Sequence, residues 1–367
     1  GKYRQIIRVD RNTGEDKLIS VTPTGEEGNQ NSFAPVISAD GKTIAFESYA
    51  TNLVGGDSNG SRDVFVWQES TGKIVRVSET ADGIEGNAES YEPSMSATGA
   101  VIAFTSNASN LAAGAKGTST ANVFVKDMNT NKIRILSLDP KNKSGVGGSN
   151  PSVSYSGELI AFYSFASTLV DKDENGLWDI FVWESGNPKL KKLSFHPTGA
   201  DKEQGNESSS RVVAPSISGN GKYVAFATTA NNLVQGDGNR SQDAFVVEIE
   251  TNRTIRVSQG PDGIEGDSDS PIKQGEKVAI SYDGQWIAFS TVSKNLGGNV
   301  LLRNWVTNET KIISKGIGAT VGEPAISAFG NYVVFGTSQR LDSKFQSSGI
   351  FGIYTGLSGC RFCPQQN

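Results

Sequence analysis

The residues best suited to chemistry in this sequence are oxygen-bearing side chains that alternate along a glycine-containing loop. Residues 171–179 read D-K-D-E-N-G-L-W-D, which places oxygen-bearing side chains at loop positions 1, 3, 5 and 9 and a glycine at position 6. Calcium loops hold the ion through oxygen atoms at this spacing, with a backbone carbonyl at position 7. An EF-hand is excluded, because Val182 stands where its twelfth-position glutamate would be. We therefore expect a Ca²⁺ site of the shortened D-x-D-x-N-G type with these ligands: Asp171, Asp173, Asn175, the Leu177 carbonyl and Asp179.

Two other loops repeat part of this pattern. Residues 55–63 read G-G-D-S-N-G-S-R-D, and residues 235–243 read Q-G-D-G-N-R-S-Q-D. Neither loop has a carboxylate at its first position, and Asp, Asn and Gly are also the usual residues of metal-free turns. Both interpretations stay open for these loops. If calcium binds, the expected ligands are Asp57, Asn59, Ser61 and Asp63 in the first loop, and Asp237, Asn239, Ser241 and Asp243 in the second.

Other groups that commonly do chemistry are scarce. His196 is the single histidine, which excludes a three-histidine zinc site, and its setting in S-F-H-P-T-G favours a surface turn. Cys360 and Cys363 are the only cysteines and form a Cys-x-x-Cys pair. Haem attachment would need a histidine where Pro364 stands. We expect the pair to form a local disulfide, or to contact a partner or a downstream segment.

The composition favours a β-rich protein and argues against a nucleic-acid-binding one. The chain of 367 residues carries 34 Lys+Arg against 39 Asp+Glu, a net charge of −5. Proteins that bind duplex nucleic acid normally present a basic face. A hydrophobic fraction of 36% is enough to build a core, and 42 glycines favour many turns. No apolar run approaches the roughly 20 residues of a membrane-spanning helix.

A repeated unit supplies the elements that must position these loops. A Ser-x-x-Gly turn followed by an apolar strand recurs six times, beginning at Ser38, Ser96, Ser154, Ser218, Ser281 and Ser327. The first unit contains four segments of alternating apolar residues, at residues 35–38, 43–48, 63–68 and 73–78. Such alternation between glycine-bearing turns is typical of antiparallel strands. A repeated four-stranded meander predicts a β-propeller, whose four-stranded sheets are called blades.

The repeat also resembles a known family. The S-x-D-G-x-x-I/V-A-F core, with D-V/I-F-V and T-G-x-x-x-R-V-S downstream, resembles the PD40, or WD40-like, repeats of the TolB-type propellers. The resemblance covers residues 3–356 and implies an all-β protein of the cell envelope that works through protein contacts. We expect one propeller domain at residues 1–356, with six blades or alternatively seven, and a tail at residues 357–367.

The ends of the chain decide how such a ring would close. Residues 5–22 match the last two strands of a blade. We expect them to pair with the strand at residues 333–337 and so to remove an exposed sheet edge. A third strand at residues 349–354 is then left over, which keeps two alternatives open: a seventh, incomplete blade, or pairing with another subunit.

The connections between blades add further acidic groups. In a propeller these connections emerge on the same face as the loops between second and third strands. They are acidic and glycine-rich at residues 25–32, 83–90, 203–209 and 263–270. Glu89, Glu207 or Asp269 could therefore complete a calcium shell, or the rim could simply be solvated.

Together these features favour a secreted, periplasmic or cell-surface propeller that uses Ca²⁺ and binds a protein or polysaccharide without catalysis. Two other functions stay open. One is a structural subunit of an extracellular filament or surface layer, assembled through the terminal strands and tail. The other is a glycosidase or lyase acting on polysaccharide, which would need paired carboxylates that the sequence does not place.

Overall fold

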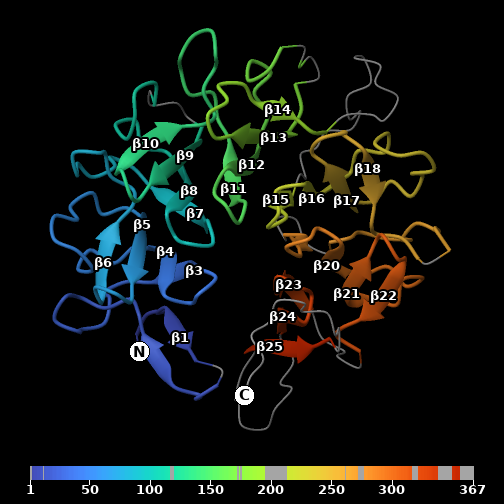
Figure 1. Ribbon diagram of the computed structural model, residues 1–367, viewed down its shortest axis with the longest axis horizontal. Coiled ribbons are helices and arrows are strands. Elements are labelled where there is room, and N and C mark those ends of the chain that lie inside the picture. Colours follow the sequence, from blue (N-terminus) through green and yellow to red (C-terminus); the bar gives the residue numbers. More distant parts are fainter. Residues whose placement is uncertain are drawn as a thin grey trace. The chain divides into compact units, whose positions relative to one another are not determined.

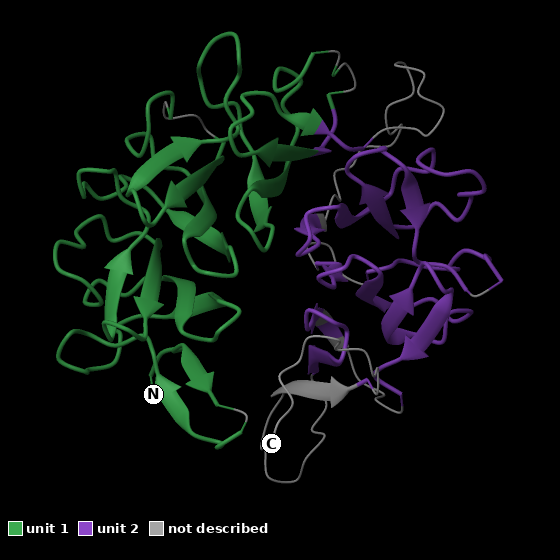
Figure 2. Ribbon diagram, viewed as in Figure 1, with its two compact units in different colours: residues 1–176, 181–191 green, residues 177–180, 192–367 purple. Residues whose placement is uncertain are grey.

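The computed structural model describes residues 2–10, 12–115, 120–171, 173, 176–194, 213–260, 262–271, 277–315, 321–337 and 349–355 (Figure 1). These residues form 25 β-strands, which confirms the expected all-β class. Within them, no helix could cross a membrane. The chain divides into two compact units, residues 1–176 with 181–191 and residues 177–180 with 192–367 (Figure 2).

The first unit begins with a hairpin and continues with antiparallel four-stranded sheets, which match the expected blades. The hairpin consists of β1 (Ile7–Val9) and β2 (Asp16–Leu18). The first blade consists of β3 (Ser32–Ile37), β4 (Thr43–Ser48), β5 (Asp63–Gln68) and β6 (Lys73–Arg76). The second consists of β7 (Ser90–Met95), β8 (Val101–Ser106), β9 (Asn122–Asp127) and β10 (Lys132–Ile135). The third consists of β11 (Ser149–Val153), β12 (Leu159–Ser164), β13 (Asp179–Glu184) and β14 (Lys191–Lys192), and the boundary between the two units falls within it.

The second unit contains two further blades and a three-stranded sheet. The fourth blade consists of β15 (Val213–Ile217), β16 (Tyr223–Thr228), β17 (Asp243–Glu248) and β18 (Thr254–Arg256). The fifth consists of β19 (Ala279–Ile280), β20 (Trp286–Thr291), β21 (Asn299–Asn304) and β22 (Glu309–Ile312). The last sheet consists of β23 (Val321–Ile326), β24 (Tyr332–Thr337) and β25 (Gly349–Tyr354).

Each Ser-x-x-Gly segment forms the turn between the first and second strands of a sheet. In the first blade, the Ser38 hydroxyl accepts a hydrogen bond from the backbone N–H of Thr43 at 2.9 Å, and Gly41 has a φ of 71°. Side chains disfavour that φ, so glycine suits the position. The equivalent serine accepts the same hydrogen bond in the five other repeats. These two requirements explain the constant spacing of serine and glycine.

The hydrophobic cores lie between consecutive sheets of each unit. In the first unit, Val64 of the first blade packs in one cluster with Phe104 of the second. In the second unit, Val246 of the fourth blade packs in one cluster with Phe289 of the fifth. A sheet that buries both faces needs apolar residues on both, which explains the nearly continuous apolar runs of the second and third strands. This stacking fixes the loops at the strand ends.

The N-terminal hairpin stacks on the first blade in the way a preceding blade would. Ile6 and Ile19 are buried in one cluster with Phe46. The Ser20 hydroxyl accepts a hydrogen bond from the backbone N–H of Ile6 at 2.9 Å, as Ser78 does between the fourth and third strands of the first blade. The hairpin therefore has the structure of the third and fourth strands of a blade.

The last sheet corrects the expected pairing of the N-terminal strands. β25 pairs with β24 through six residue pairs, and β23 pairs with the other edge of β24. The expected pairing of the N-terminal strands with residues 333–337 is therefore wrong, because β25 occupies that edge of β24. β1 pairs instead with β2 in a sheet of two strands. The number of blades and the closure of the ring stay predictions.

Candidate metal centre

Three acidic side chains from separate segments converge beside the first blade. Asp57 lies in the loop between β4 and β5, Asp63 begins β5, and Glu85 lies in the connection from β6 to β7. One carboxylate oxygen of each lies within 4.8 Å of the others. An antiparallel bridge between Glu79 and Glu85 holds the turn that carries Glu85. We call Asp57, Asp63 and Glu85 the first acidic cluster.

The second unit contains an equivalent arrangement, which we call the second acidic cluster. Asp237, Asp243 and Glu265 bring their carboxylate oxygens equally close together. Asp243 begins β17, and Glu265 lies in a turn closed by a bridge to Gln259. Two repeats that lie far apart in the sequence therefore build the same arrangement.

An arginine from the fourth strand enters each cluster. In the first cluster, Arg76 Nη1 contacts Glu85 and lies 3.8 Å from Asp63 Oδ2, and Nη2 donates a hydrogen bond to the Gly56 carbonyl at 2.9 Å. In the second, Arg256 Nη1 lies 2.7 Å from Glu265 Oε2 and 3.8 Å from Asp237 Oδ1. Each cluster has three carboxyl groups and one guanidinium. When all three carboxyl groups are ionised, two negative charges lack a counter-charge from the arginine.

Part of this charge also lacks a hydrogen-bond donor. Asp57 Oδ1 is buried and accepts no hydrogen bond. The side chain of Asp237 is 3% exposed, and its Oδ1 lies 3.8 Å from Arg256 Nη1, which is too far for a hydrogen bond. Burial raises the pKa of Asp57 and Asp237 to about 6 and that of Asp243 to about 7. Since an uncompensated buried charge is costly, each cluster favours the uptake of a proton or of a cation.

The predicted amide and hydroxyl ligands make hydrogen bonds within their loops, and calcium coordination by them stays a prediction. Asn59 Nδ2 donates hydrogen bonds to Asp63 Oδ2 at 3.0 Å and to the Gly86 carbonyl at 2.8 Å. Asn59 Oδ1 accepts from the backbone N–H of Ser61 at 2.6 Å. Asn59 and Ser61 thus shape the loop and orient Asp63.

The second cluster repeats this arrangement. Asn239 Nδ2 donates to Asp243 Oδ2 at 3.0 Å, and its Oδ1 accepts from the backbone N–H of Ser241 at 2.8 Å. The amides therefore organise both loops in the same way.

The loop at residues 171–179 differs from these two. Asp179 is buried and pairs with Lys192 at 2.8 Å, and Asp173 is buried as well. The side chain of Asp171 is 89% exposed and lies 3.6 Å from Lys141 Nζ. Asn175 falls outside the described residues, and Leu177 lies just before β13. Among the residues that the structure describes, this loop contributes to no group of three converging acids. Calcium binding here stays a prediction.

From one repeat to the next, the residue at the start of the third strand changes together with the residue at the end of the fourth strand. Aspartate is accompanied by a cation: Asp63 with Arg76, Asp179 with Lys192, and Asp243 with Arg256. An amide is accompanied by an aliphatic residue: Asn122 with Ile135, Asn299 with Ile312, and Gln5, just before β1, with Leu18. A buried charge needs a partner and a neutral amide does not, which accounts for the exchange. This pattern is the sequence signal that could have identified Arg76 and Arg256.

The other acidic candidates lie apart from the clusters or outside the described residues. Glu89 lies 3.7 Å from Arg62 Nη2, and Asp269 accepts a hydrogen bond from the backbone N–H of Gln242. The following residues lie outside the described ranges: His196, Glu207, Cys360, Cys363 and the rest of the tail at 357–367. The possible disulfide therefore stays a prediction.

Comparison with known proteins settles the fold. No protein-family model and no curated protein matches the sequence. The β-propeller domain of the Trilobed protease from Pyrococcus furiosus is 13% identical, with a TM-score of 0.55 over 96% of this chain and 88% of that chain. The fold is a β-propeller.

Two other similar structures have lower scores. A prolyl endopeptidase gives a TM-score of 0.53 at 10% identity, over 84% of this chain and 39% of that chain. TolB from Acinetobacter baumannii gives 0.46 at 15% identity, over 83% of this chain and 58% of that chain. This propeller thus spans less than two thirds of that TolB.

The donor set of the two propeller clusters suits a hard divalent cation. Ca²⁺ takes oxygen ligands, with carboxylates prominent among them. Each cluster offers three carboxylates and two charges that the arginine does not compensate. Asp57 also has a buried oxygen that accepts no hydrogen bond. The residues therefore fit a Ca²⁺ ion, which Asp57, Asp63 and Glu85 would hold in one site and Asp237, Asp243 and Glu265 in the other.

Proposed function

We propose that this protein is a secreted or cell-envelope propeller that binds another protein without catalysis and stabilises its binding loops with Ca²⁺. The observation that carries the proposal is the convergence of three carboxyl groups beside a single arginine in each acidic cluster, together with the orphaned oxygen of Asp57. Extracellular modules bind calcium with Kd values of roughly 10⁻⁴–10⁻³ M, which suits a site with few ligands and partial exposure.

The ion would join two segments that the backbone leaves separate. Asp57 and Asp63 belong to the loop at residues 55–63, and Glu85 belongs to the turn at residues 79–86. Without the ion, Ser58 of the loop donates to Glu85 and Asn59 donates to the Gly86 carbonyl. Arg76 bridges the two segments by donating to Glu85 and to the Gly56 carbonyl. A shared cation would add ionic contacts and reduce the motion of both segments.

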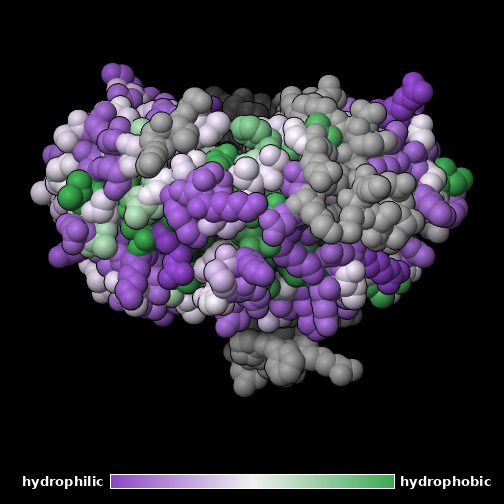
Figure 3. Space-filling view, turned by 90° about the horizontal axis from the view of Figure 1, so that it is seen from above, coloured by the Kyte–Doolittle hydropathy of each residue, from purple (hydrophilic) through white to green (hydrophobic). Residues whose placement is uncertain are grey.

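The same turn presents an apolar side chain to solvent. Ile84 precedes Glu85, and Ile264 precedes Glu265, and each isoleucine is 60% exposed. In the view of Figure 3, hydrophilic residues predominate and hydrophobic ones form small separate areas. An isolated exposed isoleucine is ordinary. Two at equivalent positions beside equivalent acidic clusters favour contact with a protein, because aliphatic side chains give little affinity for polysaccharide.

Thermal unfolding in calcium and in excess chelator tests the metal part of the proposal. An ion that binds only the folded state adds about 2.7 kcal/mol per site at a hundredfold excess over Kd. We expect calcium to raise the Tm by several degrees, and Glu85→Gln with Glu265→Gln to remove most of that rise. Glu27→Gln is the matched control, because Glu27 holds the same place in the repeat, where the position equivalent to Asp63 is the neutral Gln5. Equal Tm values of the wild type in calcium and chelator would overturn the metal part.

Photo-cross-linking from position 82, where Asp82 is an exposed residue of the same turn, tests the binding part. A partner protein captured in calcium, and lost with Ile84→Ser and Ile264→Ser, would support a binding surface at these turns. A partner captured equally by the variant would place the binding surface elsewhere.

A further inference from the structure

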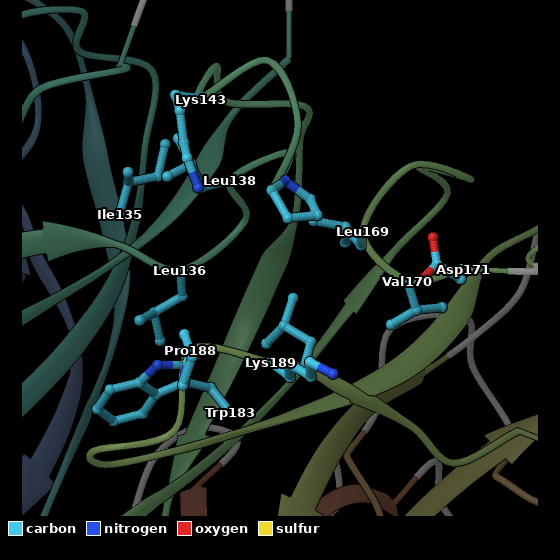
Figure 4. A pocket seen from close by; sticks show the side chains of 12 residues that line it. Ile135, Leu136, Leu138, Lys143, Leu169, Val170, Asp171, Trp183, Pro188 and Lys189 are labelled. Carbon is cyan, nitrogen blue, oxygen red and sulfur yellow. The ribbon is translucent and has the colours of Figure 1, made fainter.

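A cavity beside Trp183 lies at the junction of the second and third blades, away from both acidic clusters. Its volume is about 280 Å³, and it lies entirely within the first unit. Its apolar walls are formed by Leu136, Leu138, Leu169, Val170, Trp183 and Leu190. Figure 4 shows Leu136, Leu138 and Trp183 on one side of the open space, with Leu169 and Val170 on the other. We call this cavity the Trp183 pocket.

A second cavity adjoins it through the same tryptophan. This cavity has a volume of about 220 Å³, and its lining includes Lys132, Arg134 and Trp183. The Arg134 guanidinium lies over the Trp183 ring, 5.8 Å from its centroid. Trp183 therefore separates an apolar cavity from a basic one.

The charges around the two cavities are predominantly positive, in a chain whose net charge is −5. Lys143 and Lys189 line the Trp183 pocket, and Lys132 and Arg134 line the second cavity. The two lining acids already have partners. Asp171 lies 3.6 Å from Lys141. Asp127 accepts hydrogen bonds from two backbone N–H groups of its own turn. The four lining cations outnumber the two lining acids, so the two cavities together favour a ligand with negative charge.

This arrangement is specific to one place in the repeat. The residue equivalent to Lys143 is a glycine in the two repeats that carry acidic clusters, Gly83 and Gly263, and all three residues have a positive φ. The residue equivalent to Trp183 is Trp67 in the first blade, where it is 1% exposed because the N-terminal hairpin packs on it. Trp183 is half-buried and remains accessible.

We infer that the Trp183 pocket receives a large apolar side chain of a partner polypeptide whose flanking residues are acidic. A volume of about 280 Å³ suits one aromatic or leucine side chain, and its aliphatic walls offer few donors for sugar hydroxyls. The four surrounding cations match carboxylates on either side of that anchor, as expected for complementary surfaces. The inference goes beyond the proposed function, because it involves no residue of either acidic cluster.

A synthetic peptide tests the inference directly. The probe is a blocked heptapeptide with a central phenylalanine and three acidic residues on each side, titrated by calorimetry and by tryptophan fluorescence. We expect saturable binding with a Kd below about 1 mM. The fluorescence change should disappear in Trp183→Phe, which assigns it to this tryptophan. Absence of saturable binding to the wild type would overturn the inference.

Variants of the peptide and of the protein separate the two parts of the recognition. A central alanine in the peptide should weaken binding at least tenfold, and so should Lys143→Glu combined with Lys189→Glu. The matched control is Lys222→Glu with Lys294→Glu, which changes the net charge equally at exposed lysines of the other unit. If the alanine peptide binds as tightly as the phenylalanine peptide, the role of the pocket is overturned. If both double lysine variants lose the same amount of peptide affinity, the role of Lys143 and Lys189 is overturned. All titrations are done in chelator, so failure of the calcium proposal leaves this test unaffected.

Discussion

At the scale of single residues, the two acidic clusters depend on how buried charge is balanced. Asp63 and Asp243 are fully buried, and each accepts a hydrogen bond from a serine at the end of the fourth strand, Ser78 or Ser258. Arg76 and Arg256 supply one positive charge each, against three carboxylates. The carboxylate charge that the arginine does not neutralise decides how the stability of these loops responds to pH, to cations and to substitutions.

The first prediction concerns pH in the absence of metal. Burial raises the pKa of Asp237 to about 6 and that of Asp243 to about 7, above the value of about 3.9 expected in an unfolded chain. Between about pH 4 and pH 7 the folded state therefore binds more protons than the unfolded state, so these groups add stability as the pH falls through that window. In chelator, the wild type should gain more stability from about pH 7.5 to pH 5 than Asp237→Asn does. Equal pH dependence in urea unfolding would contradict the prediction.

The second prediction concerns the exchange of charged for neutral pairs. Arg76→Ile leaves Asp63 buried without its cation and should cost about 3 kcal/mol of unfolding free energy in chelator. Adding Asp63→Asn should recover most of the lost unfolding free energy, because Asn122 and Ile135 already occupy the same two positions in the second blade. Denaturant unfolding of both single variants and the double variant measures the coupling. A double variant as unstable as Arg76→Ile would show that the charge is not the cause.

At the scale of elements, the repeat explains why the fold could be predicted. The serine, glycine and alternating apolar residues of each unit meet local requirements, namely a turn hydrogen bond, a positive φ and two buried faces. The candidate site could be predicted only in part. Asp57 and Asp63 lie in one loop with a recognisable spacing, whereas Glu85 joins them through the packing of a separate connection. Spacing along the chain carries no information on that convergence.

The third prediction tests the repeated turn. Gly41 has a φ of 71°, and a β-carbon added there would meet no atom closer than 4.0 Å, so strain would come from the backbone alone. Gly41→Ala should therefore cost about 1 kcal/mol, measured by urea unfolding. Gly55→Ala is the control, because Gly55 has open space around it and no positive φ. Equal stability of the two variants would contradict the role assigned to this glycine.

At the scale of the whole molecule, sequence patterns could not decide how the strands at the two ends of the chain pair. Residues 5–9 and 349–354 both read as third strands of a blade, and periodicity does not decide which of them pairs with β24. The structure assigns that edge to β25 and stacks the N-terminal hairpin on the first blade. The hairpin therefore contributes to stability through packing in its own unit, whatever closes the ring.

The fourth prediction follows from that packing. Deleting residues 1–22 removes Ile6 and Ile19 and exposes a face that includes Phe46 and Trp67. The truncated protein should aggregate or become protease-sensitive, because exposed apolar sheet faces associate. Size-exclusion chromatography and limited proteolysis measure the outcome, and deletion of residues 357–367 is the control with an expected mild effect. A monomeric, protease-resistant truncated protein would contradict the prediction.

The number of calcium ions bound per chain tests the central claim most directly. Equilibrium dialysis of the wild type against millimolar calcium should give at least two ions, and Glu85→Gln with Glu265→Gln should bind two fewer, because each substitution removes one of three carboxylate ligands. Any ion retained by that double variant would bind outside the two clusters, and the loop at residues 171–179 is the place where we expect it. Equal ion counts for the wild type and the double variant would contradict the account.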